Sequence, residues 1–159
     1  MSGMGTISGF RELFQYDAWA NRRLFEVFAD LPVHHEVLST WSHHLLSQKL
    51  WLARIKDEAY DRLSLWTVLS VPESGTLIHE LERRWSHLLE DLTDADLAQI
   101  VKFNNTQGVA QADRLGDILA HVTHHAAYHR GQVTVRMSAV GFTPPATDLI
   151  IWARSKLFV

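Results

Sequence analysis

Cysteine is absent from this chain of 159 residues. Its absence excludes disulfides, thiolate zinc sites, cysteine nucleophiles and iron–sulfur clusters. A transition-metal site must therefore be built from histidine, aspartate and glutamate. Two other residue types are in excess, with ten histidines and six tryptophans.

A surplus of positive charge is also lacking. The net charge is −3 with histidine counted as neutral, and the longest basic runs are the pairs Arg22-Arg23 and Arg83-Arg84. Proteins that bind nucleic acid or anionic lipid carry a basic patch or stripe. We therefore expect no nucleic acid and no membrane as partners.

Long apolar runs are missing too. No stretch approaches the roughly 18 apolar residues of a membrane-spanning helix. The N-terminal segment shows neither the basic stretch nor the apolar run of a secretory signal. The length and the hydrophobic content of 47% fit one globular domain with a substantial core. We expect a single domain over residues 1–159, located in the cytoplasm.

Four long helices are predicted from apolar residues that recur at helical spacing. Their ranges are about 8–30, 36–60, 76–92 and 115–140. Ser8 is the expected N-cap of the first helix, and Pro72 with Gly75 marks the expected break before the third. The apolar segment 63–71 is interpreted as a connection.

Two smaller elements complete the predicted fold. The helical period fails over residues 98–112, where Ile100–Phe103 and the pair Asn104-Asn105 indicate a small hairpin. A short C-terminal helix is expected to begin near Asp148. Together these elements predict an all-α protein, a four-helix bundle with a short fifth helix and a minor hairpin.

The second predicted helix is apolar on nearly every side. Trp41, Leu45 and Leu52 lie on one face, and Leu46 and Leu50 lie on nearly the opposite one. A helix of this kind is packed on most sides. We expect part of that packing to come from a second copy of the chain in a homodimer.

The fourth predicted helix carries three histidines in steps of four residues. His121, His125 and His129 share one face, and neighbouring imidazoles on it can converge on one ion. The alternative is a helix whose histidines are hydrogen-bonded or solvated, and spacing alone does not separate the two. The metalloprotease signature H-E-x-x-H is not matched, because Ala126 stands where that signature has its catalytic glutamate.

Three blocks of sequence make the interpretation more specific. Residues 16–21 read Y-x-x-W-A-N, residues 43–54 read H-x7-W-L-x-R, and residues 121–132 read H-x3-H-x3-H-R-G-Q. In this order and at these intervals, the blocks resemble the DNA-damage-inducible, DinB-like family of bacterial four-helix proteins. Relatives of that family use low-molecular-weight thiols such as bacillithiol and mycothiol.

The resemblance implies a metal site. In that family, one histidine of the second helix and two of the fourth hold a divalent transition-metal ion. Carried onto this sequence, the ligands are His43, His125 and His129. The offset from Trp51 selects His43 over His44, and His121 is then a neighbour of the site rather than a ligand.

Three imidazoles leave at least one coordination position for water or substrate, as in catalytic metal sites. They suit zinc or nickel, with iron and copper as further candidates. We therefore expect a metal-dependent enzyme acting on a small molecule, either a hydrolase or, as the resemblance implies, a thiol S-transferase. The alternative is a stress-response or interaction module that binds metal without catalysis.

Ligand histidines usually donate their second N–H to a carboxylate or carbonyl. Asp17, Asn21 and Gln132 lie on inward-facing stripes and are candidates for this role, with ordinary interhelical hydrogen bonding as the alternative. Arg130 is expected to pair with a carboxylate at a helix end or to bind substrate. The tryptophans assigned to the core are Trp19, Trp41, Trp51 and Trp85.

Overall fold

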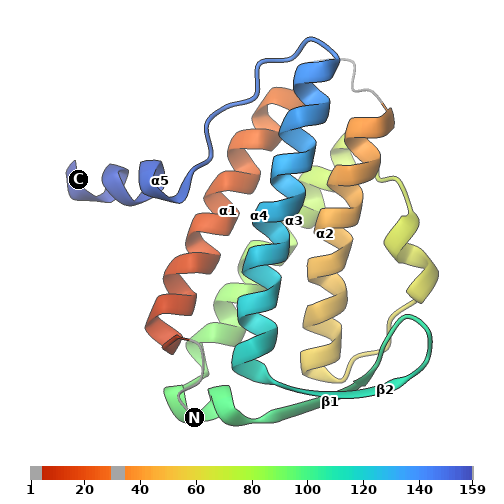
Figure 1. Cartoon of the computed structure of the whole chain (residues 1–159), viewed down its shortest axis with the longest axis vertical. Coiled ribbons are helices and arrows are strands. Elements are labelled where there is room, and N and C mark those ends of the chain that lie inside the picture. Colours follow the sequence, from red (N-terminus) through yellow and green to blue (C-terminus); the bar gives the residue numbers. More distant parts are fainter. Residues whose placement is uncertain (1–4, 30–34, 159) are drawn as a thin grey trace.

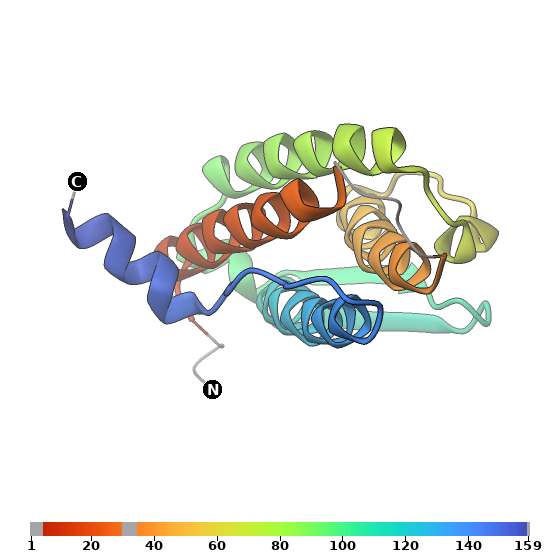
Figure 2. The same cartoon turned by 90° about the horizontal axis from the view of Figure 1, so that it is seen from above.

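The structure is a computed structural model that describes residues 5–29 and 35–158. Four long helices lie side by side in it (Figure 1). They are α1 (Ile7–Ala29), α2 (His35–Lys56), α3 (Val71–Glu90) and α4 (Leu115–Ala139). Around the bundle their order is α1, α3, α2, α4, so each helix packs against two neighbours (Figure 2). The predicted four-helix bundle is confirmed, while the first helix's predicted end near Asp30 lies outside the described residues.

The connection between α2 and α3 runs back along the side of the bundle (Figure 1). It contains a short 3-10 helix, η1 (Arg62–Trp66), which packs against α2. Because this connection returns to the starting end, α2 and α3 run in the same direction. The connection predicted over residues 63–71 is confirmed except at Val71, where α3 begins.

The third helix begins before the predicted break. The Ser70 backbone N–H donates to Glu73 Oε2 (2.7 Å), and the Glu73 N–H donates to Ser70 Oγ (3.4 Å), which makes a capping box. Pro72 stands in the first turn, where the helix needs no N–H donor. A Cβ at Gly75 would lie 2.9 Å from a ring carbon of Phe25, so glycine here permits close packing of α3 on α1. The predicted break is wrong because both residues serve the helix itself.

The second helix ends at Lys56, short of the predicted residue 60. Asp57 takes a left-handed φ of 52°, and the Glu58 N–H donates to the Ala53 carbonyl (2.8 Å). This is a Schellman-type end, in which glycine usually fills the left-handed position. The sequence does not indicate this end of the helix, because aspartate rather than glycine stands at the left-handed position.

The ends of α1 and α4 lie close to their predicted positions. Thr6 rather than Ser8 caps α1, since Thr6 Oγ1 accepts a hydrogen bond from the Gly9 N–H (3.2 Å). The predicted N-cap is therefore wrong by two residues. The predicted stop of α4 is confirmed, because Gly141 follows the helix with a φ of 90°.

The predicted hairpin and C-terminal helix are both present. Strands β1 (Ile100–Asn104) and β2 (Ala110–Arg114) pair antiparallel, with Ile100 opposite Arg114. The hairpin follows a 3-10 helix, η2 (Asp94–Ala98), lies across one end of the bundle and leads directly into α4 (Figure 1). The C-terminal helix α5 (Leu149–Ser155) is followed by the short 3-10 helix η3 (Lys156–Phe158).

The apolar core of the bundle is fully enclosed. Leu24, Trp41, Leu45, Leu119 and Met137 are completely buried there, and they come from α1, α2 and α4. The apolar residues of the long helices thus serve the core. Within the described ranges, no helix is long and apolar enough to cross a membrane.

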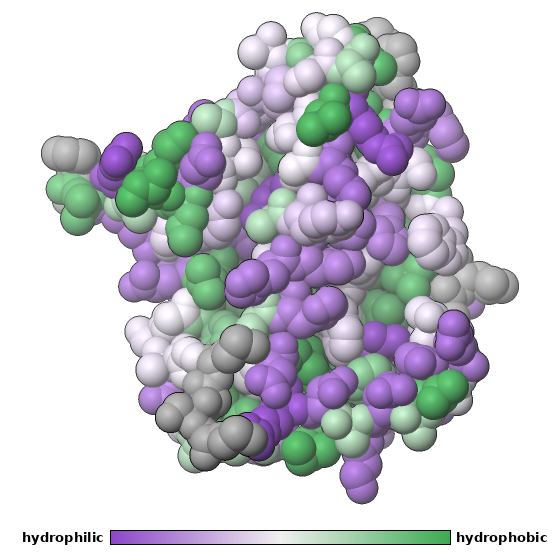
Figure 3. Space-filling model, viewed as in Figure 1, coloured by the Kyte–Doolittle hydropathy of each residue, from purple (hydrophilic) through white to green (hydrophobic). Residues whose placement is uncertain are grey.

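Helix α5 projects from the side of the bundle (Figures 1 and 2). Its Trp152 is buried and lies 5.9 Å, ring to ring, from Tyr16 of α1. Leu149, Ile150 and Ile151 are exposed on it and form a hydrophobic patch (Figure 3). The apolar faces of α2, in contrast, are buried by the chain's own elements. The homodimer stays a prediction, and an exposed apolar patch lies on α5 rather than on α2.

Candidate metal centre

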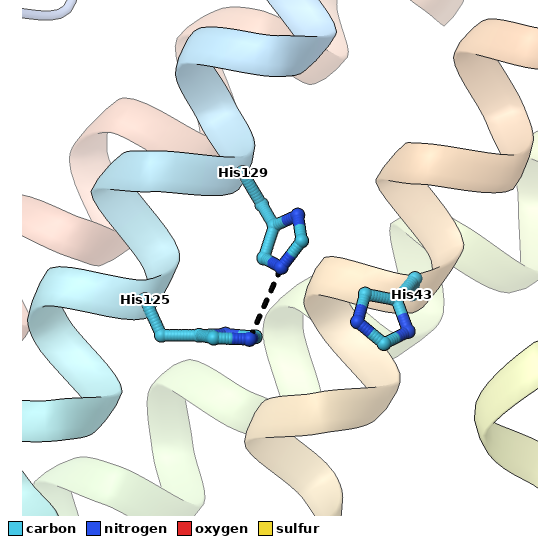
Figure 4. A group of neighbouring side chains, drawn as sticks. All are labelled: His43, His125 and His129. Atoms are coloured by element: carbon cyan, nitrogen blue, oxygen red, sulfur yellow. Dashed lines mark hydrogen bonds between the residues drawn. The ribbon is translucent and has the colours of Figure 1, made fainter.

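Three imidazoles converge between α2 and α4. His43 comes from α2, and His125 and His129 come from successive turns of α4 (Figure 4). One ring nitrogen of each lies within 4.8 Å of the other two, and the Nε2 atoms of His125 and His129 are 3.1 Å apart. All three side chains are partly exposed. No carboxylate or further histidine of the described residues joins the group.

The spacing of these nitrogens fits a metal ion. In a tetrahedral zinc site with Zn–N distances of about 2.0–2.1 Å, ligand nitrogens lie about 3.3 Å apart. The pair His125 and His129 already has this separation, at 3.1 Å. One ring nitrogen of His43 lies within 4.8 Å of the ligand nitrogens of both. The group could therefore hold an ion with three nitrogens and leave at least one coordination position.

Burial keeps the imidazoles of His125 and His129 neutral. It lowers the pKa of His125 to about 4, and repulsion from His129, His121 and His43 adds to the effect. Burial also lowers the pKa of His129, although its hydrogen bond with Gln132 opposes the shift. Near neutral pH both rings are therefore uncharged, and each has a lone pair to offer a metal ion.

Gln132 fixes the orientation of His129. Its Oε1 lies 2.8 Å from His129 Nδ1. An amide oxygen only accepts hydrogen bonds, so Nδ1 carries the proton and Nε2 presents its lone pair to the centre. Of the three residues predicted to support the ligands, Gln132 is the one that contacts a histidine of the group.

The connection after α2 orients His43 in a similar way. His43 Nδ1 lies 3.4 Å from the Leu65 carbonyl oxygen, which can only accept its proton. The indole of Trp66 stacks on the imidazole, with centroids 4.9 Å apart and an angle of 18°. Sequence reasoning missed both partners, because segment 63–71 carries no pattern that assigns it a role beyond connection.

Asp17 and Asn21 lie in a buried polar network rather than against the three histidines. Asp17 forms an ion pair with Arg130 of α4. Asp17 Oδ2 accepts hydrogen bonds from Asn21 Nδ2 (3.1 Å) and from Gln48 Nε2 of α2 (2.8 Å). Gln48 Oε1 accepts one from Trp85 Nε1 of α3 (3.0 Å). The network thus joins all four helices, and interhelical bonding is the role of both residues.

Arg130 and His44 also belong to this network. Burial disfavours the Arg130 charge, but the Asp17 carboxylate and Tyr16 together outweigh burial and raise the pKa of Arg130. The predicted carboxylate partner is therefore present, in the middle of the bundle and not at a helix end. His44 Nε2 lies 2.9 Å from Asn21 Oδ1, and burial lowers the pKa of His44 well below its ordinary value. The structure thus brings His43, and not His44, to the imidazole group.

Aromatic side chains surround the three histidines. His121 lies 5.3 Å from His125, ring to ring, and Trp51 lies 5.3 Å from His121. Tyr128 is 64% exposed and lies 5.2 Å from His129. Trp51 is only partly buried. The prediction that it belongs to the core is therefore only partly correct.

Comparisons with known proteins agree with this fold. A model of the DinB family matches residues 1–156. The curated protein "Protein DinB" of Bacillus subtilis (strain 168) is 26% identical over an alignment of 153 positions, which covers 86% of this chain and 89% of that protein. The crystal structure of a DinB-like protein from Bacillus cereus ATCC 10987 is similar with a TM-score of 0.67 and 21% identity, and the match covers 92% of this chain and 99% of that one.

Proposed function

The chain belongs to the DinB family, and from this membership and the three converging imidazoles we propose that it is a metal-dependent enzyme that joins a low-molecular-weight thiol to an electrophile. The ion is a divalent transition metal held by His43, His125 and His129. Zinc and nickel are the first candidates, followed by iron and copper. Hydrolysis of a small ester or amide is the second reaction that such a site supports.

One observation carries the proposal. The three imidazole nitrogens lie within 4.8 Å of one another, and no fourth ligand from the described part of the chain joins them. Structural zinc sites use four protein ligands, whereas catalytic sites use three and leave a position for an outside molecule. A metal ion held in this way supplies a Lewis acid that favours the deprotonated form of a thiol or of water near neutral pH.

The chain's own residues set the surroundings of the reaction. Because the chain has no cysteine, the reacting sulfur belongs to a substrate. Trp66, which is 75% exposed beside His43, and Tyr128 beside His129 present rings against which an apolar electrophile can pack. The carbonyl of Leu65 holds His43 in one tautomer, as Gln132 does for His129.

The orienting role of Gln132 predicts a moderate loss of metal affinity in Gln132→Ala. His129 would lose the acceptor that fixes its tautomer, and such changes cost about 10–100-fold in affinity. Competition titration against a chromophoric chelator measures the change. Gln107→Ala, on the exposed hairpin loop, is the matched control. Equal affinities in the two variants would contradict the role of Gln132.

The proposed activity is tested with metal-free protein reloaded with one divalent metal at a time. Each form is incubated with a chromogenic aryl halide and bacillithiol, mycothiol or glutathione in turn. The sulfur forms a bond to the aryl carbon, halide leaves, and the thiol proton passes to solvent. One metal should restore a rate at least about 100-fold above that of the chelated protein.

The controls separate the metal centre from other histidines. His129→Ala should match the chelated protein, and His79→Ala, on the exposed side of α3, should match the unaltered chain. Ester and amide substrates are included to detect hydrolysis. If thiol, ester and amide are consumed no faster than with His129→Ala, both thiol transfer and hydrolysis are ruled out. A non-catalytic metal-binding module then becomes the better account.

A further inference from the structure

A buried arginine near the end of α2 has no ionic partner among the described residues. Arg54 is 8% exposed, and its Nε is buried without a hydrogen-bond partner in the described part of the chain. The other buried arginine, Arg130, is paired with Asp17. A guanidinium taken out of water is costly unless acceptors compensate it. Arg54 therefore differs from an arginine that serves only to join helices.

Aromatic rings hold the Arg54 guanidinium in place. Its Cζ lies 4.5 Å from the ring centroid of Trp51, 4.5 Å from that of Phe103 and 5.8 Å from that of Tyr60. Cation–π contacts of this kind stabilise the positive charge. They do not supply the oxygen acceptors that the guanidinium N–H groups require. The charge is thus fixed in position, and the Nε–H donor still lacks an acceptor among the described residues.

Arg54 lines a cleft of about 710 Å³ between the end of α2 and the hairpin. That volume lies within the range of small-molecule sites. Lys102 of β1 adds a second cation to the lining, and Asp57 and Glu58 add two carboxylates. The Glu58 charge is compensated by an ion pair with Arg84.

A series of ring contacts connects Arg54 to the imidazole group. Arg54 contacts Trp51 at 4.5 Å, Trp51 contacts His121 at 5.3 Å, and His121 contacts His125 at 5.3 Å. The Arg54 guanidinium is therefore no farther from the His125 ring than the sum of these three distances. A substrate whose oxyanion binds at Arg54 must therefore extend past Trp51 and His121 to bring its reactive group to the histidines.

We propose that the cleft is a substrate subsite in which Arg54 binds an oxyanion group, a carboxylate or a phosphate, of a small molecule. Arginine recognises both groups through paired, charge-assisted hydrogen bonds. The identification of that molecule as a substrate of thiol transfer rests on the proposed function. The oxyanion site itself does not.

Binding of simple anions to metal-free protein tests the subsite. Succinate and inorganic phosphate are titrated at constant ionic strength by calorimetry, with neutral succinamide as the control ligand. The NMR signal of the Arg54 Nε–H is followed in parallel. At least one anion should bind and shift this signal, and succinamide should bind at least about tenfold more weakly. The anion that binds more tightly shows whether the recognised group is a carboxylate or a phosphate.

Arg54→Gln should weaken the binding at least about tenfold. Arg23→Gln is the matched control, because Arg23 also covers an indole, that of Trp19 at 5.1 Å, but lies exposed on α1. Arg54→Lys retains the charge without paired donors, so intermediate affinity is expected even if Arg54→Gln fails to fold. Unchanged affinity in the folded Arg54 variants, or no anion binding to the unaltered chain, overturns the proposal. Because neither metal nor turnover is involved, that failure is distinguishable from failure of the proposed function.

Discussion

Replacing His125 with alanine is expected to remove stoichiometric metal binding. The Nε2 of His125 lies 3.1 Å from that of His129, and without it only two of the three converging nitrogens remain. The affinity should fall by more than the roughly 100-fold that loss of an outer hydrogen bond costs, because a direct ligand is lost. Elemental analysis of gel-filtered protein and a chelator competition titration measure the loss.

The matched controls lie on the same helix and on another one. His121→Ala removes the ring that lies 5.3 Å from His125 but is not part of the group of three. His79→Ala removes an exposed histidine of α3. Both should retain one metal ion per chain. A fully occupied His125→Ala variant with unchanged circular dichroism would refute the assignment of ligands.

The histidines of α4 show which part of the site is predictable from local pattern. A period of four residues places His125 and His129 on one face of any α-helix, and the structure confirms that they converge. The choice of His43 over His44 depends on tertiary packing instead. Adjacent residues of a helix point in different directions, and only the resemblance of the sequence blocks selected between them.

The residues that orient the ligands show where local pattern ends. Gln132 lies three positions from His129, within the reach of helical periodicity. Leu65 contributes a backbone carbonyl, which has no sequence signature at all. Trp66 reaches His43 through the path of the connection. That path depends on the packing of the whole bundle, and no spacing rule encodes it.

The predicted start of α3 and the predicted end of α2 are wrong for a related reason. Proline and glycine usually interrupt a helix, but Pro72 stands in a first turn and Gly75 lies against the ring of Phe25. One of these exceptions depends on the position of the cap and the other on a neighbouring helix. Asp57 conceals the end of α2, because its left-handed backbone is rare outside glycine and asparagine.

The buried ion pair between Asp17 and Arg130 predicts the largest change in stability. Arg130→Met removes the cation but leaves the Asp17 carboxylate 4% exposed, and its remaining donors among the described residues are the neutral amides of Asn21 and Gln48. Breaking a buried pair from one side costs about 3–5 kcal/mol, a large fraction of the 5–15 kcal/mol that stabilises a typical domain. Urea unfolding of metal-free protein, followed by circular dichroism, measures the free energy of unfolding without the contribution of a bound ion.

Two further variants identify the source of the loss. Asp17→Asn combined with Arg130→Met removes both charges and keeps an amide where Asn21 and Gln48 bond, so part of the lost stability should return. Arg22→Ala, in the half-exposed ion pair with Glu82 on α3, should cost no more than about 1 kcal/mol. If Arg130→Met costs no more than Arg22→Ala, the network joins the helices without stabilising them. That outcome is unexpected, because without Arg130 the Asp17 carboxylate is a buried charge without a cation. Two neutral amides alone compensate a buried charge poorly.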